Sequence, residues 1–363
     1  MERHIQNFTI HAYKGIHNLT LENLNVINIL TGDNNSGKTS VLELLSTLKS
    51  PESTRSWDMR SGANGWGYRL CFNYFYNMFP IDEEKKEISY SFIEQNGQEN
   101  TVMLKAEFEE TQITEKEMYR LNGLSRTGSA KREEELIDTT CMQLVTYING
   151  DAVNEDRIYD FQTILSSRRN RKVHFVKTLY ISPVAYASGS LPMNEILSDP
   201  ELYAEMLNIL QIFDENITNI NALKDDKNPF TTEYMVLTKS HAKALPLTAY
   251  GDGMKKAMLL LSAVVSAQNG ILLLDEFETA IHTSAMDSVF SWLLQSAIRL
   301  NVQVFLTSHS NKEAIDKVLR CSPDLQPYIN LYTLYNYDGQ NYIRRMSCEE
   351  AINARDNLGL ELR

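Results

Sequence analysis

Eight residues near the N-terminus decide the fold: Gly32-Asp33-Asn34-Asn35-Ser36-Gly37-Lys38-Thr39. They match the pattern G-x-x-x-x-G-K-[ST] at every fixed position. The short apolar run at 26–30 precedes them and indicates a buried strand, and apolar residues recur at helical spacing over 40–48. A strand, a glycine-rich loop and a helix in this order predict a phosphate-binding loop, because the loop turns successive backbone N–H groups inward.

The residue types of this loop match the chemistry of a nucleoside triphosphate. Lys38 would neutralise the β- and γ-phosphates, and the hydroxyl of Thr39 would bind Mg²⁺. The helix N-terminus adds a partial positive charge. We expect nucleotide contacts along the whole loop and the residue after it: Gly32, Asp33, Asn34, Asn35, Ser36, Gly37, Lys38, Thr39 and Ser40.

A second motif is an aliphatic strand that ends in two acids. The run Ile271-Leu272-Leu273-Leu274 is followed by Asp275 and Glu276. Together with the upstream loop it predicts that Asp275 holds Mg²⁺. Glu276, one position later, would act as the general base that accepts a proton from the water attacking the γ-phosphate. The alternative is that Glu276 is a salt-bridge partner at the strand end.

A third motif follows the next aliphatic strand. Val302–Leu306 leads into Thr307-Ser308-His309-Ser310. Parallel strands present their C-terminal ends to one crevice, so we expect His309 to reach the γ-phosphate that Glu276 faces. The alternative is a structural histidine at a strand end.

A fourth motif is a glycine turn before the apolar stretch Ala257–Ala267, which we expect to be a helix. Such a turn at a helix N-terminus either binds phosphate or only reverses the chain. We predict phosphate contacts from Gly251, Asp252 and Gly253.

The remaining patterns give the fold class. After Ala257, helices alternate with continuous aliphatic strands, which is typical of a parallel sheet covered by helices. The fold is therefore predicted to be α/β, a P-loop NTPase with a largely parallel core sheet, an N-terminal antiparallel β subdomain and a helical/β insertion. Hairpins are expected around Asn96-Gly97 and Asp338-Gly339, and helical segments within 112–138 and 192–224.

Composition excludes several classes of protein. The 363 residues include 35 Lys and Arg against 47 Asp and Glu, a net charge of −12 that repels phosphate backbones on average. The four cysteines form no C-x-x-C pair, which disfavours a disulfide framework and a zinc site and suits a reducing cytoplasm. The N-terminus lacks the apolar core of a signal peptide, and no apolar stretch approaches the ~20 residues of a membrane helix.

One dense basic run departs from the acidic average. It is either a solvated loop or a patch for phosphates or an acidic partner. Its members are Arg168, Arg169, Arg171, Lys172, His174 and Lys177.

These motifs resemble the ABC-type ATPase heads of the SMC, RecF and OLD group, most of all the small stand-alone AAA15-family, or OLD-like, ATPases. Residues 50–240 match only loosely. The matching residues are Tyr13-Lys14-Gly15, the loop 32–39, Gly251-Asp252-Gly253, Leu274-Asp275-Glu276-Phe277-Glu278, His282 and Thr307-Ser308-His309-Ser310.

The resemblance implies ATP and Mg²⁺ as cofactors and an ATP-induced homodimer. In that family the glycine turn, here 251–253, completes the γ-phosphate site of the opposing protomer, so two heads close around two ATP molecules. It implies one ATPase domain over 1–363. Its parts would be an N-terminal β region with the phosphate loop (1–50), an insertion (51–240), and a lobe with the glycine turn, the acidic strand end and the histidine (241–363). No long heptad pattern separates the motifs, so an SMC-like coiled coil is not expected.

The leading hypothesis is a cytoplasmic ATP hydrolase that dimerises on ATP and switches a separate effector protein, a nuclease or a toxin, in bacterial antiphage defence or a toxin-like system. The alternative is a RecF-like ATPase of DNA repair that binds DNA through the basic run. A GTP-driven switch is a third hypothesis, but Ser310-Asn311-Lys312-Glu313-Ala314 lacks the Asp of a guanine-reading N-K-x-D motif.

Overall fold

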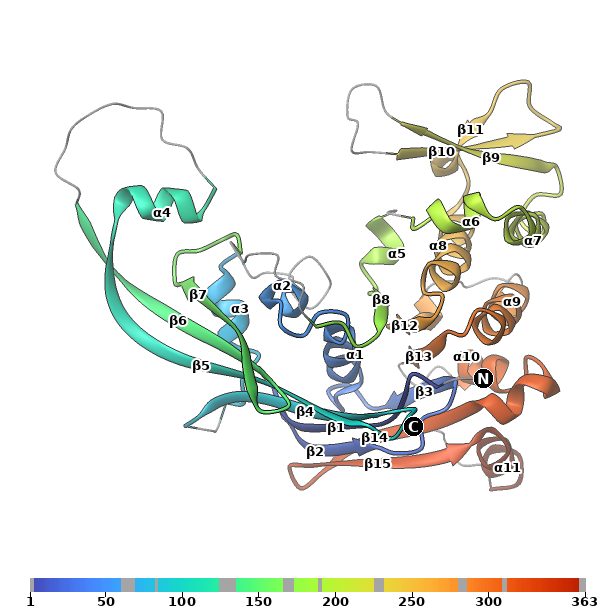
Figure 1. Cartoon of the computed structure of the whole chain (residues 1–363). Helices are drawn as coiled ribbons and strands as arrows, with labels where there is room; N and C mark the ends of the chain where they lie inside the picture. The colour runs from blue at the N-terminus through green and yellow to red at the C-terminus, as the bar shows by residue number, and fades with distance from the viewer. Residues whose placement is uncertain are drawn as a thin grey trace.

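The computed structural model describes residues 3–59, 69–81, 84–123, 135–165, 173–188, 191–224, 232–279, 286–308 and 312–358. Within them the strands form two six-stranded sheets and one three-stranded sheet. Figure 1 shows the core sheet and its helices on one side of the molecule and a long, curved arm of β-structure on the other.

The core sheet carries the phosphate loop. Its strand order is β15-β14-β3-β13-β12-β8, and every neighbouring pair is parallel except β14 with β15. This confirms the predicted largely parallel sheet and the hairpin at Asp338-Gly339. The bounds are β3 Ile27–Gly32, β8 Lys177–Ile181, β12 Gly270–Leu274, β13 Gln303–Thr307, β14 Ile329–Tyr337 and β15 Gln340–Ser347.

Both faces of this sheet are buried, which explains why its strands are continuously aliphatic. Leu272 and Leu274 pack on one face with the long helices α8 and α9. Ile271 and Leu273 pack on the other face with α1 and the antiparallel sheet. The helices are α1 Lys38–Thr47, α8 Asp252–Ser266, α9 Met286–Arg299, α10 Lys312–Leu319 and α11 Cys348–Leu358.

The second six-stranded sheet is antiparallel, with the order β2-β1-β4-β5-β6-β7, and confirms the predicted N-terminal antiparallel region. The predicted hairpin around Asn96-Gly97 is β4–β5, and β5 and β6 continue together as the arm of Figure 1. The bounds are β1 Ile5–Tyr13, β2 Ile16–Leu21, β4 Lys86–Glu94, β5 Glu99–Thr114, β6 Leu136–Ile148 and β7 Asp151–Tyr159.

The three-stranded sheet corrects one prediction. Helical structure was expected over 192–224, but after α6 (Asn194–Ser198) and α7 (Pro200–Leu210) the chain forms β9 (Ile217–Lys224). Ile217 and Ile220 are buried while most of the strand is exposed, and hydrogen bonds to β10 override the helical pattern of the preceding segment. The other strands are β10 Thr232–Thr238 and β11 Leu245–Pro246.

Two further boundaries differ from expectation. Helix α8 begins at Asp252 rather than near Ala257, so Asp252 and Gly253 lie in its first turn. Of the segment 112–138, only α4 (Glu115–Leu121) is helical in the described part, because β5 continues to Thr114. The short helices are α2 Thr54–Trp57, α3 Cys71–Tyr76, α5 Ala185–Ser188, and the 3₁₀ turns η2 Leu247–Ala249, η3 Phe277–Thr279 and η4 Pro323–Tyr328.

The four cysteines are free, as expected for a chain without a disulfide framework. Among the helices of the described ranges, none has both the length and the hydrophobicity that crossing a membrane requires.

Candidate functional site

The phosphate loop requires glycine at both ends. A Cβ at Gly32, where φ is 138°, would lie 2.0 Å from the carbonyl oxygen of Leu334 on the neighbouring strand β14. A Cβ at Gly37, where φ is 99°, would lie 2.6 Å from Cδ1 of Ile16. Both positions combine a left-handed backbone with close packing, so a side chain would strain them. The sequence pattern thus encodes the tight turn between β3 and α1.

Lys38 is the first residue of α1 and its side chain turns back into the loop. Its Nζ donates to the carbonyl oxygens of Gly32 and Asp33, both at 2.8 Å. Burial lowers the pKa of Lys38, and the carboxylates of Asp275 and Glu278 oppose that shift. The N-cap Gly37 has no side chain to satisfy the first N–H groups of α1, so these donors and the ammonium can serve an anion together.

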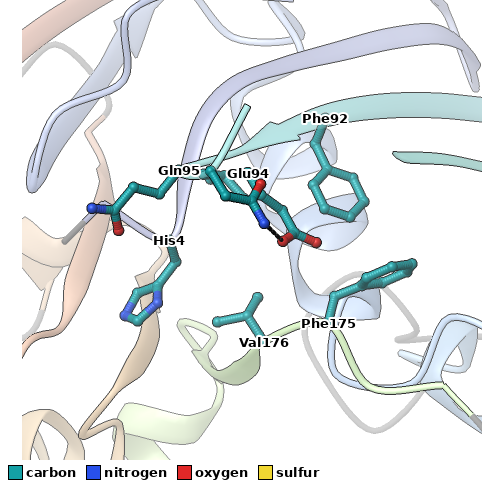
Figure 2. Close-up of a pocket in the computed structure, with 8 residues that line it drawn as sticks. His4, Phe92, Glu94, Gln95, Phe175 and Val176 are labelled. Carbon is teal, nitrogen blue, oxygen red and sulfur yellow. Dashed lines mark hydrogen bonds between the residues drawn. The ribbon is translucent and has the colours of Figure 1, made fainter. Parts of the chain in front are cut away.

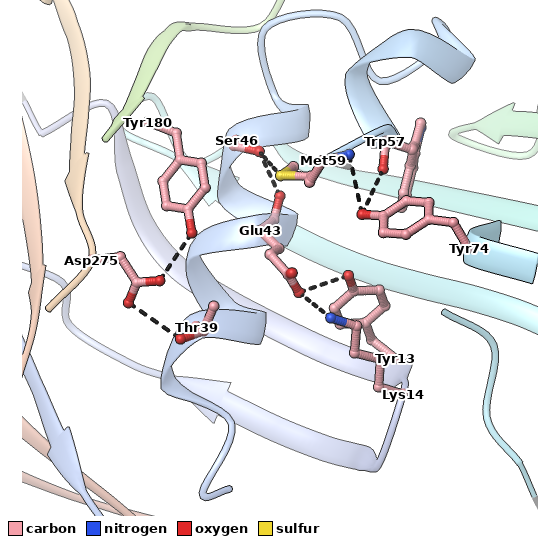
Figure 3. Close-up of polar contacts among 10 residues, drawn as sticks. All are labelled: Tyr13, Lys14, Thr39, Glu43, Ser46, Trp57, Met59, Tyr74, Tyr180 and Asp275. Atoms are coloured by element: carbon pink, nitrogen blue, oxygen red, sulfur yellow. Dashed lines mark hydrogen bonds and ion pairs between the residues drawn. The ribbon is translucent and has the colours of Figure 1, made fainter. Parts of the chain in front are cut away.

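Asp275 directly follows β12 and is the centre of a hydroxyl cluster. Only 2% of it is exposed. Its Oδ1 accepts from Oγ1 of Thr39 at 3.2 Å and from Oγ1 of Thr307 at 2.5 Å, and its Oδ2 accepts from the hydroxyl of Tyr180 at 2.9 Å. Figure 3 shows Thr39 and Tyr180 approaching the carboxylate from α1 and β8. Burial raises the pKa of Asp275, and the three hydroxyl donors oppose that rise.

Thr307 and Glu276 connect this cluster to the next strand. Strand β13 lies between β3 and β12, so its last residue, Thr307, sits between the phosphate loop and the acidic pair. The backbone N–H of Glu276 donates to Oγ1 of Thr307 at 2.8 Å. Glu276 has a φ of 48°, a left-handed conformation that is uncommon for a residue with a Cβ and typical of functional sites.

The oxygen atoms of Thr39 and Asp275 fit a magnesium ion. Mg²⁺ prefers oxygen ligands, and in nucleotide sites it takes only one or two from the protein and the rest from phosphates and water. A hydroxyl and a carboxylate oxygen that are 3.2 Å apart beside the phosphate loop meet this requirement.

A second polar cluster lies on the other side of α1. Glu43, of which only 1% is exposed, accepts from the hydroxyl of Tyr13 at 2.8 Å and from Nζ of Lys14 at 2.6 Å (Figure 3). Both bonds reach Oε2, and within the part of the chain that the structure describes Oε1 is buried without a hydrogen-bond partner. Glu43 lies one helical turn after Thr39, so this cluster fixes α1 against the β1–β2 turn.

The glycine turn is separate from these clusters in the described residues. Gly251 and Asp252 are exposed at the start of α8, and a Cβ at Gly253 would contact the ring of Phe213 at 3.4 Å. Asp252 pairs with Lys255 of its own helix. No hydrogen bond in the described ranges joins this turn to the phosphate loop of the same chain.

Two sequence predictions fall on residues that the structure does not describe. His309 and Ser310 lie outside the described residues, as does His282. Arg168, Arg169, Arg171 and Lys172 of the basic run also lie outside them. His174 is described: its Nδ1 lies 2.7 Å from the carbonyl oxygen of Lys49.

The sequence patterns do not indicate the roles of three side chains at the site. Thr307 belongs to the histidine motif but is not marked there as a partner of the acids, and neither Tyr180 nor Glu43 belongs to a motif. Tyr180 comes from a five-residue strand that is 95 positions away from Asp275 in the chain. A tyrosine in a short β-rich segment is a common strand former, so no local signal marks it.

A cavity of about 460 Å³ lies at the opposite end of the parallel strands. Figure 2 shows His4, Glu94 and Phe175 around it, and Val176 precedes β8. Ligands of open α/β sheets bind at the carboxyl ends of the strands, so this cavity is not part of the phosphate site.

Comparisons with curated proteins agree with this geometry. The chain is 24% identical over 348 residues to an ATP/GTP phosphatase of Helicobacter pylori, a match that covers 87% of this chain and 88% of that protein. A stretch of 115 residues is 36% identical to an uncharacterized protein of Methanocaldococcus jannaschii, and it covers 31% of this chain and 98% of that protein.

A comparison with solved structures addresses the fold. The crystal structure of an SMC head bound to the C-winged helix domain of ScpA matches with a TM-score of 0.50 at 10% sequence identity, over 97% of this chain and all of the other. The expected fold, an ATPase head of the ABC type as in the SMC group, is confirmed. A family model matches residues 27–316, most of the chain, and this confirms the expected ATPase. The chain belongs to the family described as "AAA domain, putative AbiEii toxin, Type IV TA system".

Proposed function

We propose that this ATPase binds ATP together with Mg²⁺ at the phosphate loop and hydrolyses it with Glu276 as the general base. The observation that supports the proposal is the meeting of Thr39, Asp275 and Thr307, from three separate elements, beside the loop. The proposed nucleotide contacts are those of the loop and of Ser40. Thr39 and Asp275 are the proposed metal ligands.

Each group has one task in the proposed reaction. The loop N–H groups and the ammonium of Lys38 hold the phosphates and balance their charge. The cation, when bound, supplies further charge neutralisation at the phosphate oxygens. Glu276 orients a water molecule and takes its proton as the water oxygen bonds to the γ-phosphorus, and the bond to the β-phosphate oxygen breaks. The products are ADP and inorganic phosphate. His309 is the proposed contact to the γ-phosphate.

The glycine turn supports a dimeric form of this site. Gly251 and Asp252 are exposed and apart from the chain's own phosphate loop, as a segment that serves an opposing protomer would be. We infer that Gly251, Asp252 and Gly253 complete the site of a second copy, so that two heads close around two ATP molecules. The division into regions 1–50, 51–240 and 241–363 of one domain is part of this proposal.

The signalling role is the last part of the proposal. ATP-driven closure would switch a separate effector protein, a nuclease or a toxin, in the cytoplasm, as in OLD-like antiphage systems. The family description names a putative toxin of a type IV toxin–antitoxin system, and it supports the toxin-like system in this proposal. A protein encoded by the neighbouring gene that copurifies only with the ATP-bound form would be the expected effector.

The substitution Glu276→Gln tests the proposed base and the dimer together. We expect ATP turnover to fall while ATP binding persists, so that light scattering finds a stable dimer with ATP and Mg²⁺. Glu117→Gln on helix α4, in which no residue is buried, is the control, with wild-type turnover. A Glu276→Gln protein that binds ATP and stays monomeric would contradict the proposed ATP-induced dimer. A Glu276→Gln protein that hydrolyses ATP at the wild-type rate would contradict the role of Glu276 as general base.

Substrate choice has its own test. We propose ATP over GTP, because the sequence lacks a guanine-reading N-K-x-D motif at 311–314. The Helicobacter pylori relative is named for both nucleotides, so competition between ATP and GTP for a fluorescent analogue is the direct measurement. Equal competition would contradict the preference and leave the hydrolytic site unchanged.

A further inference from the structure

Strand β8 contacts Asp275, at the end of β12, through both a backbone hydrogen bond and a side-chain hydrogen bond. It pairs in parallel with β12, with Tyr180 opposite Leu273 and Ile181 opposite Leu274. The N–H of Asp275 donates to the carbonyl oxygen of Ile181 at 3.0 Å, and the hydroxyl of Tyr180 donates to Oδ2 of Asp275 at 2.9 Å (Figure 3). The position of Asp275 and the direction of its carboxylate are therefore both tied to β8.

The two carboxylate oxygens of Asp275 have different partners. Oδ1 accepts from Thr39 and Thr307, on the side of the phosphate loop. In the described residues, the donor to Oδ2 is Tyr180. Rotation about the last bond of an aspartate is broad and roughly two-fold, so the backbone alone does not fix the plane of the carboxylate. The bond to Tyr180 fixes that plane and keeps Oδ1 beside the hydroxyl of Thr39.

Loss of this hydroxyl would leave Oδ2 of the buried carboxylate without the donor that it has in the described residues. Asp275 is almost fully buried, so Oδ2 has no bulk water to replace Tyr180. A buried acceptor without its partner is costly, and the carboxylate would turn toward other donors. A turned carboxylate no longer presents Oδ1 next to Thr39, which is the arrangement that suits a divalent cation.

We propose that Tyr180 is a positioning residue that orients Asp275 for a divalent cation bound with a nucleoside triphosphate. The proposal rests on the metal dependence proposed above and adds a residue from β8 to it. Partners of metal ligands typically affect metal affinity by about 10- to 100-fold when they are removed, and this is the effect expected here.

Tyr186 provides a matched control in the same neighbourhood. It lies on α5, five residues after β8 ends, and its hydroxyl is buried with no hydrogen-bond partner among the described residues. Burial raises the pKa of Tyr186, and the carboxylates of Asp275, Glu278 and Glu276 raise it further. Tyr186→Phe therefore removes a buried hydroxyl near the same acids without removing a hydrogen bond, whereas Tyr180→Phe removes one.

The experiment uses the full chain with Mn²⁺ as the probe and a non-hydrolysable ATP analogue. Free Mn²⁺ is measured by electron paramagnetic resonance during a titration of wild type, Tyr180→Phe and Tyr186→Phe. We expect Tyr180→Phe to weaken Mn²⁺ binding by about 10- to 100-fold. Binding of the analogue without metal should stay close to wild type in both variants. The melting temperature of Tyr180→Phe should fall, because a buried acceptor loses its donor, and Tyr186→Phe should match wild type in all three measurements.

Three outcomes would overturn the proposal. Equal Mn²⁺ affinity of Tyr180→Phe and wild type would contradict only the positioning role of Tyr180. Equal weakening of Mn²⁺ binding in Tyr180→Phe and Tyr186→Phe would mean a general loosening of the site and would also contradict that positioning role. A wild-type protein that binds the analogue but no Mn²⁺ would contradict both the proposed metal dependence and the role of Tyr180.

Discussion

The hydroxyl of Thr307 donates a hydrogen bond to Oδ1 of Asp275 at 2.5 Å, and it accepts one from the N–H of Glu276 at 2.8 Å. One side chain at the end of β13 thus fixes both acids at the end of β12. The left-handed φ of Glu276 depends on such an anchor, because the conformation is costly for a residue with a Cβ.

The substitution Thr307→Val keeps the shape of the side chain and removes this anchor. We expect ATP turnover to fall by about 10- to 100-fold, as for other residues that orient a metal ligand. The buried carboxylate also loses a donor, so the free energy of unfolding should fall by about 1–3 kcal/mol. Thr307→Ser keeps the hydroxyl and should retain most of the turnover. Wild-type turnover in Thr307→Val, or equal losses in the Val and Ser variants, would contradict the role assigned to the hydroxyl.

Lys38 is the loop residue whose charge faces the proposed phosphates. Lys38→Ala removes an ammonium, and a hydrogen bond to a charged group contributes about 1.5–3 kcal/mol, so ATP affinity should fall by about 10- to 100-fold or more. Isothermal titration calorimetry measures this directly. Lys105→Ala, which removes an exposed cation paired with Glu87, is the control and should bind ATP like wild type.

How far the sequence predicts this fold depends on whether the determining interactions are local. The loop 32–39 and the strand 271–274 with its two acids are local patterns, and both form the predicted structure. The parallel sheet was also predictable, because strands buried on both faces must be continuously apolar. The strand β9 was not, since its pairing with β10 is a tertiary interaction that the pattern of residues 217–224 does not contain.

The candidate site shows the same division. Thr39 and Asp275 were predictable from motifs, whereas the bond from Tyr180 depends on β8 lying beside β12. That adjacency joins segments 95 residues apart, and single-sequence patterns do not give strand order. Glu43 looks like an exposed helical acid in the sequence, and its burial follows only from the packing of the β1–β2 turn against α1.

Gly32 offers a test of the loop that is independent of nucleotide. In Gly32→Ala the new Cβ would lie 2.0 Å from a backbone carbonyl oxygen of β14, at a φ of 138°. Because neither backbone can move without shifting a buried strand, we expect a loss of about 2–5 kcal/mol in the free energy of unfolding, measured with urea. Gly15→Ala is the matched control: beyond its chain neighbours, no atom of the described residues lies within 4 Å of where its Cβ would be, and its stability should change by less than about 0.5 kcal/mol. Equal stability of the two variants would contradict the close packing at Gly32.

The hydrogen bonds of Glu205 between α7 and α9 make the stability of the protein depend on pH. It accepts two hydrogen bonds from Arg299 and one from Trp292, all at 2.7 Å, and so joins α7 to α9. The bonds from Arg299, then the bond from Trp292, hold the pKa of Glu205 below its usual value, while burial partly opposes them.

A lowered carboxyl pKa in the folded state stabilises the protein above the unfolded pKa of about 4.3, and the contribution is lost as pH falls through the folded value. The side chains of Glu205 and Arg299 are 29% and 45% exposed, so solvent screening limits the effect to about 1 kcal/mol. Thermal unfolding of Glu205→Gln should therefore show a lower melting temperature than wild type at pH 7 and a smaller difference toward pH 3. Glu117→Gln, which removes a more exposed pair with Arg120, should show no such difference. A Glu205→Gln deficit that is constant from pH 7 to pH 3 would assign the effect to packing of the side chain rather than to its charge.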